Sequence, residues 1–425
     1  MQQKRFFYGW IIAIVSGVGL GTSFMIFIPA TLGILAASLH KEFGWGLAQI
    51  TSANLVATCF TVIVAPFLGA LVDRVGAKRI IVCAFIIEAL LIASFYFVGS
   101  NIVWFYARYA LLAVLSAGTT TVPFARIISR WFDRRRGIAL GIALAFTGIG
   151  GATWSKAVPY LIEHFGWRSS FLWEGGFILV IVAPLLLLVL RENPESMGFA
   201  IDGDALAAAK KAALPVEKTG LTLREAIRTR TFWAVAFAFF IIPFPIQSIM
   251  VILVPMLITN GVAPKTAATA QASLWIAMVF GRLFSGWLVD RFFAPRVAAG
   301  LVLPALIGVA MLSAGAGISA AIVAAMLVGI ANGSEGNILP YLTGKYFGLK
   351  QYTSIYASFF SCYALGSGLG APLTALMVTH FGGYTKPLYV LMGCLVVGAC
   401  TLMTFRAYPV LKASTDQRQV ATAKA

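Results

Sequence analysis

Four ionisable side chains, Arg282, Glu335, Lys156 and Glu88, lie inside long runs of apolar residues. In a segment that crosses a bilayer, such a group costs at least about 2.5 to 3.5 kcal/mol, so each is a candidate for function. A guanidinium can hold a carboxylate through two parallel hydrogen bonds, and a buried carboxyl can take up and release a proton. These residue types predict binding of a small organic anion, with a proton or a counter-anion as its partner in transport.

Arg282 lies eight residues before Asp290. At 1.5 Å per residue this places it roughly 12 Å from the end of its helix, near the middle of a membrane. We predict that it binds a substrate carboxylate. The alternative is a structural ion pair with another helix, for instance with Glu335.

Glu335 lies in the segment Asn332-Gly-Ser-Glu-Gly-Asn337, ten residues before Lys345. Ten residues of helix span about 15 Å, so this carboxyl is also predicted at mid-membrane depth and is a candidate for proton coupling. Its alternative role is a structural hydrogen bond or a pair with Arg282. Glu88 has a comparable depth and is the second candidate for proton coupling.

The composition shows which solvent surrounds most of the chain. Of 425 residues, 60% are hydrophobic and 11% are charged, with a mean hydropathy of +0.89. Runs of about 20 apolar residues are long enough to cross a bilayer as helices. The sequence predicts an all-α membrane protein with twelve spans, at about 10–35, 47–72, 80–98, 103–128, 137–163, 170–190, 231–258, 266–290, 297–318, 320–343, 352–379 and 386–406.

The net charge of +17 is explained by the distribution of the basic residues. Of 32 Lys and Arg, 24 fall in the termini and loops on one side of the predicted spans, four on the other side and four within spans. This is the positive-inside pattern, which predicts that both termini are cytoplasmic. We therefore expect a multi-pass protein of the plasma membrane, compatible with a bacterial inner membrane, and no nucleic-acid partner.

Other classes of function find little support in the sequence. The five cysteines lie in apolar spans without C-x-x-C pairs, so we expect neither a metal site nor disulfides. The three histidines lie at outer helix ends, and no nucleotide-binding P-loop is present. We predict no enzymatic activity and no cofactor, and a chain that functions as a monomer.

The chain repeats itself at an offset of about 217 residues. Gly69, Asp73 and Arg74 after the second span recur as Gly286, Asp290 and Arg291 after the eighth, and Pro123 recurs as Pro340. Internal repeats in membrane proteins are typical of transporters, with the substrate site between the repeats. The predicted organisation is a six-helix bundle at 1–190, a cytoplasmic linker at 191–230, a second six-helix bundle at 231–406 and a cytoplasmic tail at 407–425.

The segment Gly69-Ala-Leu-Val-Asp-Arg-Val-Gly-Ala-Lys-Arg79 resembles the loop signature G-x-L-x-D-R-x-G-x-(K/R)-(K/R) of the major facilitator superfamily, and a degenerate copy follows at 286–296. The resemblance implies two pseudo-symmetric six-helix bundles that rock against each other. The six repeated residues would form the gate at the inner face: the glycines permit close helix contact, and the aspartates cap helices or pair with cations.

A narrower resemblance, to monocarboxylate transporters and oxalate/formate antiporters, is carried by Phe7-Tyr-Gly-Trp10, by the segment 131–141, by Phe165-Gly-Trp-Arg168 and by Tyr346-Phe-Gly348. It implies small carboxylate substrates, with proton symport or anion exchange. It also implies a substrate role for an arginine in the eighth helix, and a cavity-facing fifth helix from which Lys156 would supply a second positive charge. The other candidates to line the pocket are Asn337, Tyr341, Phe359, Cys362 and Tyr363.

The chain departs from these families at several positions. Oxalate exchangers carry a second cation in the eleventh helix where this chain has Phe359, and animal monocarboxylate carriers have an aspartate at the place of Met278. In this superfamily the third helix usually packs peripherally, so a structural or lipid-facing role is the alternative for Glu88. We predict a secondary transporter of small monocarboxylates that works by alternating access. The alternative is a proton-coupled exporter of drugs or metabolites with the same fold.

Overall fold

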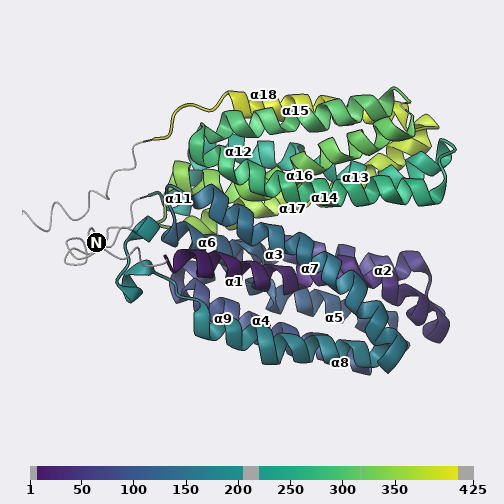
Figure 1. Cartoon of the computed structure of the whole chain (residues 1–425), viewed down its shortest axis with the longest axis horizontal. Coiled ribbons are helices and arrows are strands. Elements are labelled where there is room, and N and C mark those ends of the chain that lie inside the picture. Colours follow the sequence, from purple (N-terminus) through teal and green to yellow (C-terminus); the bar gives the residue numbers. More distant parts are fainter. Residues whose placement is uncertain (1–6, 204–219, 316, 410–425) are drawn as a thin grey trace, which may run out of the picture.

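The computed structural model describes residues 7–203, 220–315 and 317–409 (Figure 1). Two predicted segments lie largely outside the described residues. They are the tail, of which only 407–409 are described, and the middle of the linker, residues 204–219. Figure 1 shows two helical bundles side by side, one purple to teal and one green to yellow. The first turn of α1 (Gly9–Thr22) and α11 (Leu223–Ile227) lie at the same end of both bundles, which we call the linker end.

Helices in the N-terminal half follow the six predicted spans. They are α1 (Gly9–Thr22), α2 (Phe24–Phe43), α3 (Leu47–Val75), α4 (Ala77–Ser94), α5 (Ile102–Leu115), α6 (Thr121–Trp131), α7 (Arg136–Phe165), α8 (Trp167–Phe177) and α9 (Ala183–Val189). Short 3-10 turns η1 (Phe95–Phe97) and η2 (Ala117–Thr119) follow α4 and α5, and a π turn, η3 (Ile178–Val182), joins α8 to α9.

Helices in the C-terminal half follow the other six spans, after two 3-10 turns, η4 (Pro194–Met197) and η5 (Ile201–Gly203), at the start of the linker. They are α12 (Arg230–Ile241), α13 (Pro243–Thr259), α14 (Pro264–Arg291), α15 (Ala294–Ser313), α16 (Ile318–Phe347), α17 (Tyr352–Phe381) and α18 (Thr385–Met403). Among the described residues, ten segments are long and apolar enough to cross a membrane, and the shorter apolar helices α1 and α5 belong to two further spans.

Three of the predicted spans are interrupted near their middle. The seventh passes from α12 to α13 at Ile242 with its backbone still helical, whereas the first and the fourth leave the helical conformation. The first breaks at Ser23, which is extended with ψ 147° and accepts a hydrogen bond of 3.3 Å from the amide of Met25, as an N-cap of α2. The fourth breaks at 116–120, just before Pro123, whose ring cannot donate a helical hydrogen bond. Ser23 and Thr120, at the two breaks, both line the space between the two halves.

The two halves meet along two symmetric helix pairs, α3 with α17 and α7 with α14. Gly69 of α3 allows the first contact, because a Cβ atom there would lie 2.7 Å from the carbonyl oxygen of Thr353. In the second pair the backbones of Gly137 and Gly286 are in direct contact. The glycines of the repeat therefore position the crossing helices, as small residues do in membrane bundles.

Candidate functional site

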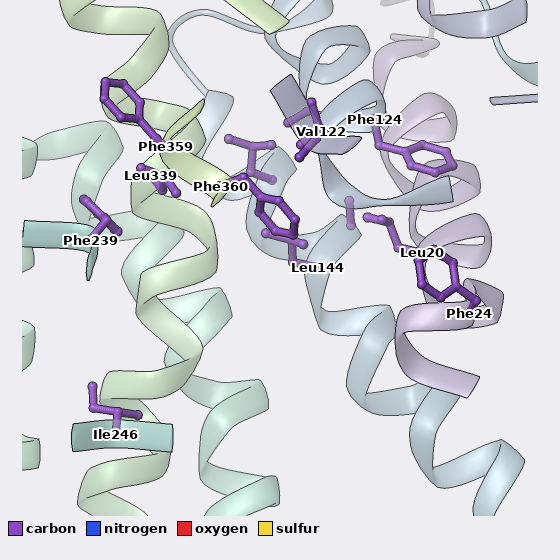
Figure 2. Packing of buried hydrophobic residues seen from close by; sticks show 14 of the residues in the cluster. Leu20, Phe24, Val122, Phe124, Leu144, Phe239, Ile246, Leu339, Phe359 and Phe360 are labelled. Carbon is purple, nitrogen blue, oxygen red and sulfur yellow. The ribbon is translucent and has the colours of Figure 1, made fainter. Parts of the chain in front are cut away.

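A cavity of about 520 Å³ lies between the two halves, lined by α1, α2, α3, α6 and α7 from one half and by α13, α14, α16 and α17 from the other. Its apolar wall includes residues from both sides, and Figure 2 shows five of them: Leu20, Phe24, Leu144, Leu339 and Phe360. Such a cavity at the repeat interface is the expected place for a transported solute.

Arg282 on α14 lines this cavity and contacts the opposite half. Its guanidinium donates to the carbonyl oxygen of Leu144 and to the hydroxyl of Thr147, both on α7. Its Nε is buried and makes no hydrogen bond. Among the described residues that line the cavity, Arg282 is the only basic side chain. The geometry therefore offers one cationic group to a ligand between the halves.

Glu335 on α16 lines the same cavity and is 5% exposed. Neither of its carboxylate oxygens makes a hydrogen bond. The structural ion pair between Arg282 and Glu335, considered from the sequence, is not formed among the described residues. A buried carboxyl without a partner is stable in its neutral form, because ionising it there would cost several kcal/mol. Glu335 therefore lines the same cavity as the cationic group without being paired with it.

The remaining candidates occupy different surroundings. Asn337 is fully buried and donates to the carbonyl oxygen of Arg282 and to the Ser285 hydroxyl, the latter at 2.9 Å. Phe359 packs on Phe232, with ring centroids 4.7 Å apart. Both lie behind the cavity wall and support the helices that form it.

Three further candidates also lie away from the cavity. Tyr341 faces Lys345 near the linker end, with the ammonium 5.8 Å from the ring centroid, and Cys362 is partly buried. Lys156 is exposed on α7. None of these three residues lines the cavity, and none accepts a hydrogen bond from Arg282. Tyr363, by contrast, lines the cavity.

Sequence reasoning missed a polar wall on the N-terminal half. Asn54, Thr58 and Thr61 of α3 all line the cavity. They are spaced by four and three residues, which places them on one face of an otherwise apolar helix. This spacing could have identified them from the sequence. Across the cavity Tyr356 of α17 pairs with the Thr121 hydroxyl at 3.2 Å. Neutral hydrogen-bonding groups thus face a ligand from both halves.

The linker end is closed by the two aspartates of the repeat. Asp73 pairs with Arg126 and accepts from the amide of Ser354 at 2.9 Å, at the start of α17. Asp290 accepts from the amides of Gly137 and Ile138, at 2.7 and 2.9 Å, at the start of α7. Each carboxylate satisfies helix N-terminal amides of the opposite half.

The two arginines of the repeat and one ion pair also lie at the linker end. Arg74 lines a small pocket beside Asp73, and Arg291 lies over the ring of Trp287 at 4.3 Å. Asp133, in the loop before α7, accepts from Lys345 of the other half at 2.8 Å. Burial alone would raise the pKa of Asp133, but the hydrogen bond from Lys345 and the nearby Arg136 hold it below its usual range.

The comparisons with known proteins agree with this architecture. Residues 9–371 match the family described as Major Facilitator Superfamily. Monocarboxylate transporter 12 of Rattus norvegicus is 24% identical over 93% of this chain and 85% of its own length. Monocarboxylate transporter 11 of Mus musculus is 26% identical, covering 95% and 88%.

The structural comparison confirms the predicted fold class. The proton:xylose symporter XylE superposes with a TM-score of 0.70 at 13% identity, covering 95% of this chain and 96% of that protein. At such low identity the likeness shows the fold alone.

Proposed function

The chain belongs to the major facilitator superfamily, and from this premise we propose that it is a secondary active transporter of small monocarboxylates that works by alternating access. The observation that carries the proposal is Arg282. Its guanidinium lies on the cavity between the halves and contacts neutral oxygens rather than a carboxylate. The names of the curated relatives support a carboxylate as its ligand.

A single basic side chain on the cavity favours a ligand with one carboxylate. The planar fork of arginine holds such a group through two hydrogen bonds, and a cation removed from water is stabilised most by an anion. The hydroxyls and the amide of α3 then face the neutral part of the substrate. A dicarboxylate would leave its second charge on these neutral groups, at a cost in desolvation.

Glu335 supplies the partner proton in this proposal. It lines the same cavity and has no hydrogen-bond partner for its carboxyl. Anion exchange is the other mode of coupling: a second carboxylate would then replace the proton as the species that returns the carrier.

The expected orientation follows from the basic residues of the linker end. This end carries both sides of the gate and most of the lysines and arginines, so we propose that it faces the cytoplasm of a bacterial cell and that the protein lies in the inner membrane. The closed linker end then corresponds to an outward-facing carrier that acts as a monomer.

The test is uptake of radiolabelled short-chain monocarboxylates into proteoliposomes, with and without an inward-directed proton gradient. Arg282→Lys keeps the charge but loses the fork, so we expect saturable uptake and counterflow at equal pH to fall at least about tenfold. The matched control is Arg108→Lys, because Arg108 donates to Ser94 and Phe97 carbonyls at the far end of the N-terminal half. Unchanged counterflow in Arg282→Lys would remove this residue from the site.

A further result separates the two functions considered from the sequence. If native protein takes up no carboxylate but exchanges protons for cationic or neutral solutes, the exporter is correct and the proposal is wrong. Dependence on the proton gradient identifies symport, and dependence on internal carboxylate identifies exchange.

A further inference from the structure

Glu88 is the most completely buried acid of the N-terminal half. It lies on α4, eleven residues after Ala77, and is 0% exposed, so it does not face lipid. Eleven residues of helix put it about 16 Å from the linker end of α4. Neither carboxylate oxygen makes a hydrogen bond. Like Glu335, Glu88 is stable there only in its neutral, protonated form.

The carboxyl of Glu88 faces the two broken helices. Polar groups close to it are the hydroxyl of Thr119, in the break between α5 and α6, and the backbone amide of Phe24, at the start of α2. Ser23 joins the two breaks, since Thr119 donates to its hydroxyl at 3.3 Å. The hydroxyls of Ser116 and Thr120 in the second break are also buried without partners. Glu88 therefore lies against a polar layer inside the bundle.

No cation accompanies Glu88 on the helices packed against α4. On α6, Arg126 pairs with Asp73 and Arg130 with Glu192, both at the linker end. On α5, Arg108 is bound to carbonyls at the opposite end, and Tyr109 is buried beside Glu174 of α8. The other charged groups of these neighbours lie at helix ends: Asp73 and Arg74 on α3, and Arg168 on α8, which pairs with Glu42. Among the described residues none of these cations forms an ion pair with Glu88, so a proton is left to neutralise its carboxyl.

The repeat gives this position a counterpart. At the offset of 217 residues Glu335 corresponds to Gly118, which lies in the break beside α4. A Cβ atom at Gly118 would lie 2.7 Å from the Cβ of Ala84, one helical turn before Glu88 on α4. The C-terminal half therefore carries its carboxyl, Glu335, on its fourth span. The N-terminal half has Gly118 at the corresponding position and carries its carboxyl, Glu88, on its third span.

The break between α1 and α2 borders the central cavity. Ser23, Phe24 and Thr120 all line the central cavity, and the first two of them flank the start of α2. Separation of Ser23 from Thr119 would connect Glu88 to that cavity. Glu174, the other buried acid of this half without hydrogen bonds, packs between α8 and α5 and does not line the cavity.

We propose that Glu88 is a second proton-binding site of the carrier, which exchanges its proton with the central cavity through the break between α1 and α2. This inference rests on the proposed carboxylate transport. Each half then contributes one acid, and one carboxylate is accompanied by two protons. One negative and two positive charges move together, so each cycle carries one net positive charge inward and uptake responds to the membrane potential.

The first measurement is independent of any substrate. Infrared difference spectra of the purified protein between neutral and alkaline pH should contain a carbonyl stretch of a buried carboxylic acid that is absent in Glu88→Gln. Retention of the whole acid signal in Glu88→Gln would show that Glu88 does not exchange a proton, whatever the substrate is.

The second measurement is transport in proteoliposomes with equal pH on both sides and a valinomycin-clamped potassium gradient. For one net charge, a tenfold potassium gradient, negative inside, raises accumulation of labelled carboxylate by up to about tenfold. We expect this in native protein and in the matched control Glu174→Gln. In Glu88→Gln the response to potential should vanish, while uptake driven by a pH gradient remains through Glu335. Potential-independent uptake in native protein, or an unchanged response in Glu88→Gln, would overturn the proposal.

Discussion

Replacing Asp73 by Asn tests whether the caps at the linker end hold the carrier closed. The Asp73 side chain is 10% exposed, and besides Arg126 it accepts from the Ser354 amide and from the Ser354 hydroxyl, the latter at 2.7 Å. Asparagine keeps the shape and one acceptor but loses the charge and turns an amide donor toward other donors. Because hydrogen bonds to charged groups contribute about 1.5 to 3 kcal/mol each, we expect closure to lose about 2 to 4 kcal/mol.

A loss of this size shifts the equilibrium between the closed and open linker end by about 25- to 700-fold. The assay is pulsed electron–electron spin resonance between labels at Arg79 and Arg296, which are exposed at the linker ends of α4 and α15. The five free cysteines are first replaced by serine or alanine. Native protein should give mainly the short distance, and Asp73→Asn a large population at a longer one.

The matched control is Asp202→Asn. Asp202 accepts from the amide of Arg134 at 2.9 Å, so its replacement also removes one negative charge at the linker end but breaks no contact between the halves. We expect the native distance distribution in this control. An unaltered distribution in Asp73→Asn would show that the cap does not contribute to closure.

Three further predictions use the same closed state. The Asp133–Lys345 pair stabilises the closed linker end at neutral pH and loses this contribution as pH falls through the lowered pKa of Asp133, so the spin-label distance should lengthen in acid, and Asp133→Asn should reduce this acid dependence. Thr147→Val is isosteric but removes one of the two oxygen acceptors of Arg282 on α7, so the same labels should report a roughly three- to tenfold larger open population; no change would mean that this bond does not hold the halves together. Asn337→Leu removes the buried amide that donates to the Arg282 carbonyl and to the Ser285 hydroxyl, and should cost about 1 to 3 kcal/mol, seen as a lower melting temperature in detergent, whereas Thr379→Val, at an exposed site on α17, should leave it unchanged.

The helices could be predicted from the sequence because lipid requires about 20 apolar residues for every crossing. The breaks at Ser23 and before Pro123 were not predicted, since hydropathy averaged over a whole span hides a single capping serine or proline. Both signals are local and present in the sequence. The aspartates of the gate were predicted from the repeat, but their partners are largely backbone amides, which no side-chain pattern reveals.

The cavity wall shows why residue type alone is a poor guide to a binding site. On α17 the residues that line the cavity include Tyr356, Phe360, Tyr363 and Ser367, at spacings of four, three and four. Phe359 is a plausible aromatic, but it lies one residue from Phe360, which turns it about 100° around the helix into the packing with Phe232. Choosing a face before choosing residues would have found Tyr356 and Phe360.

The contacts of Arg282 bear on the choice between symport and exchange. In the closed state its guanidinium donates to Leu144 and Thr147 of α7, and both bonds cross between the halves. Opening the linker end separates α7 from α14, so the guanidinium must then find another acceptor. A bound carboxylate supplies one. In an empty carrier Glu335, the only acid among the described residues that line the cavity, can pair with Arg282 after it has lost its proton. Release of that proton therefore allows the empty carrier to return, and a carrier whose Glu335 is replaced by Gln should still exchange carboxylates but should no longer accumulate them.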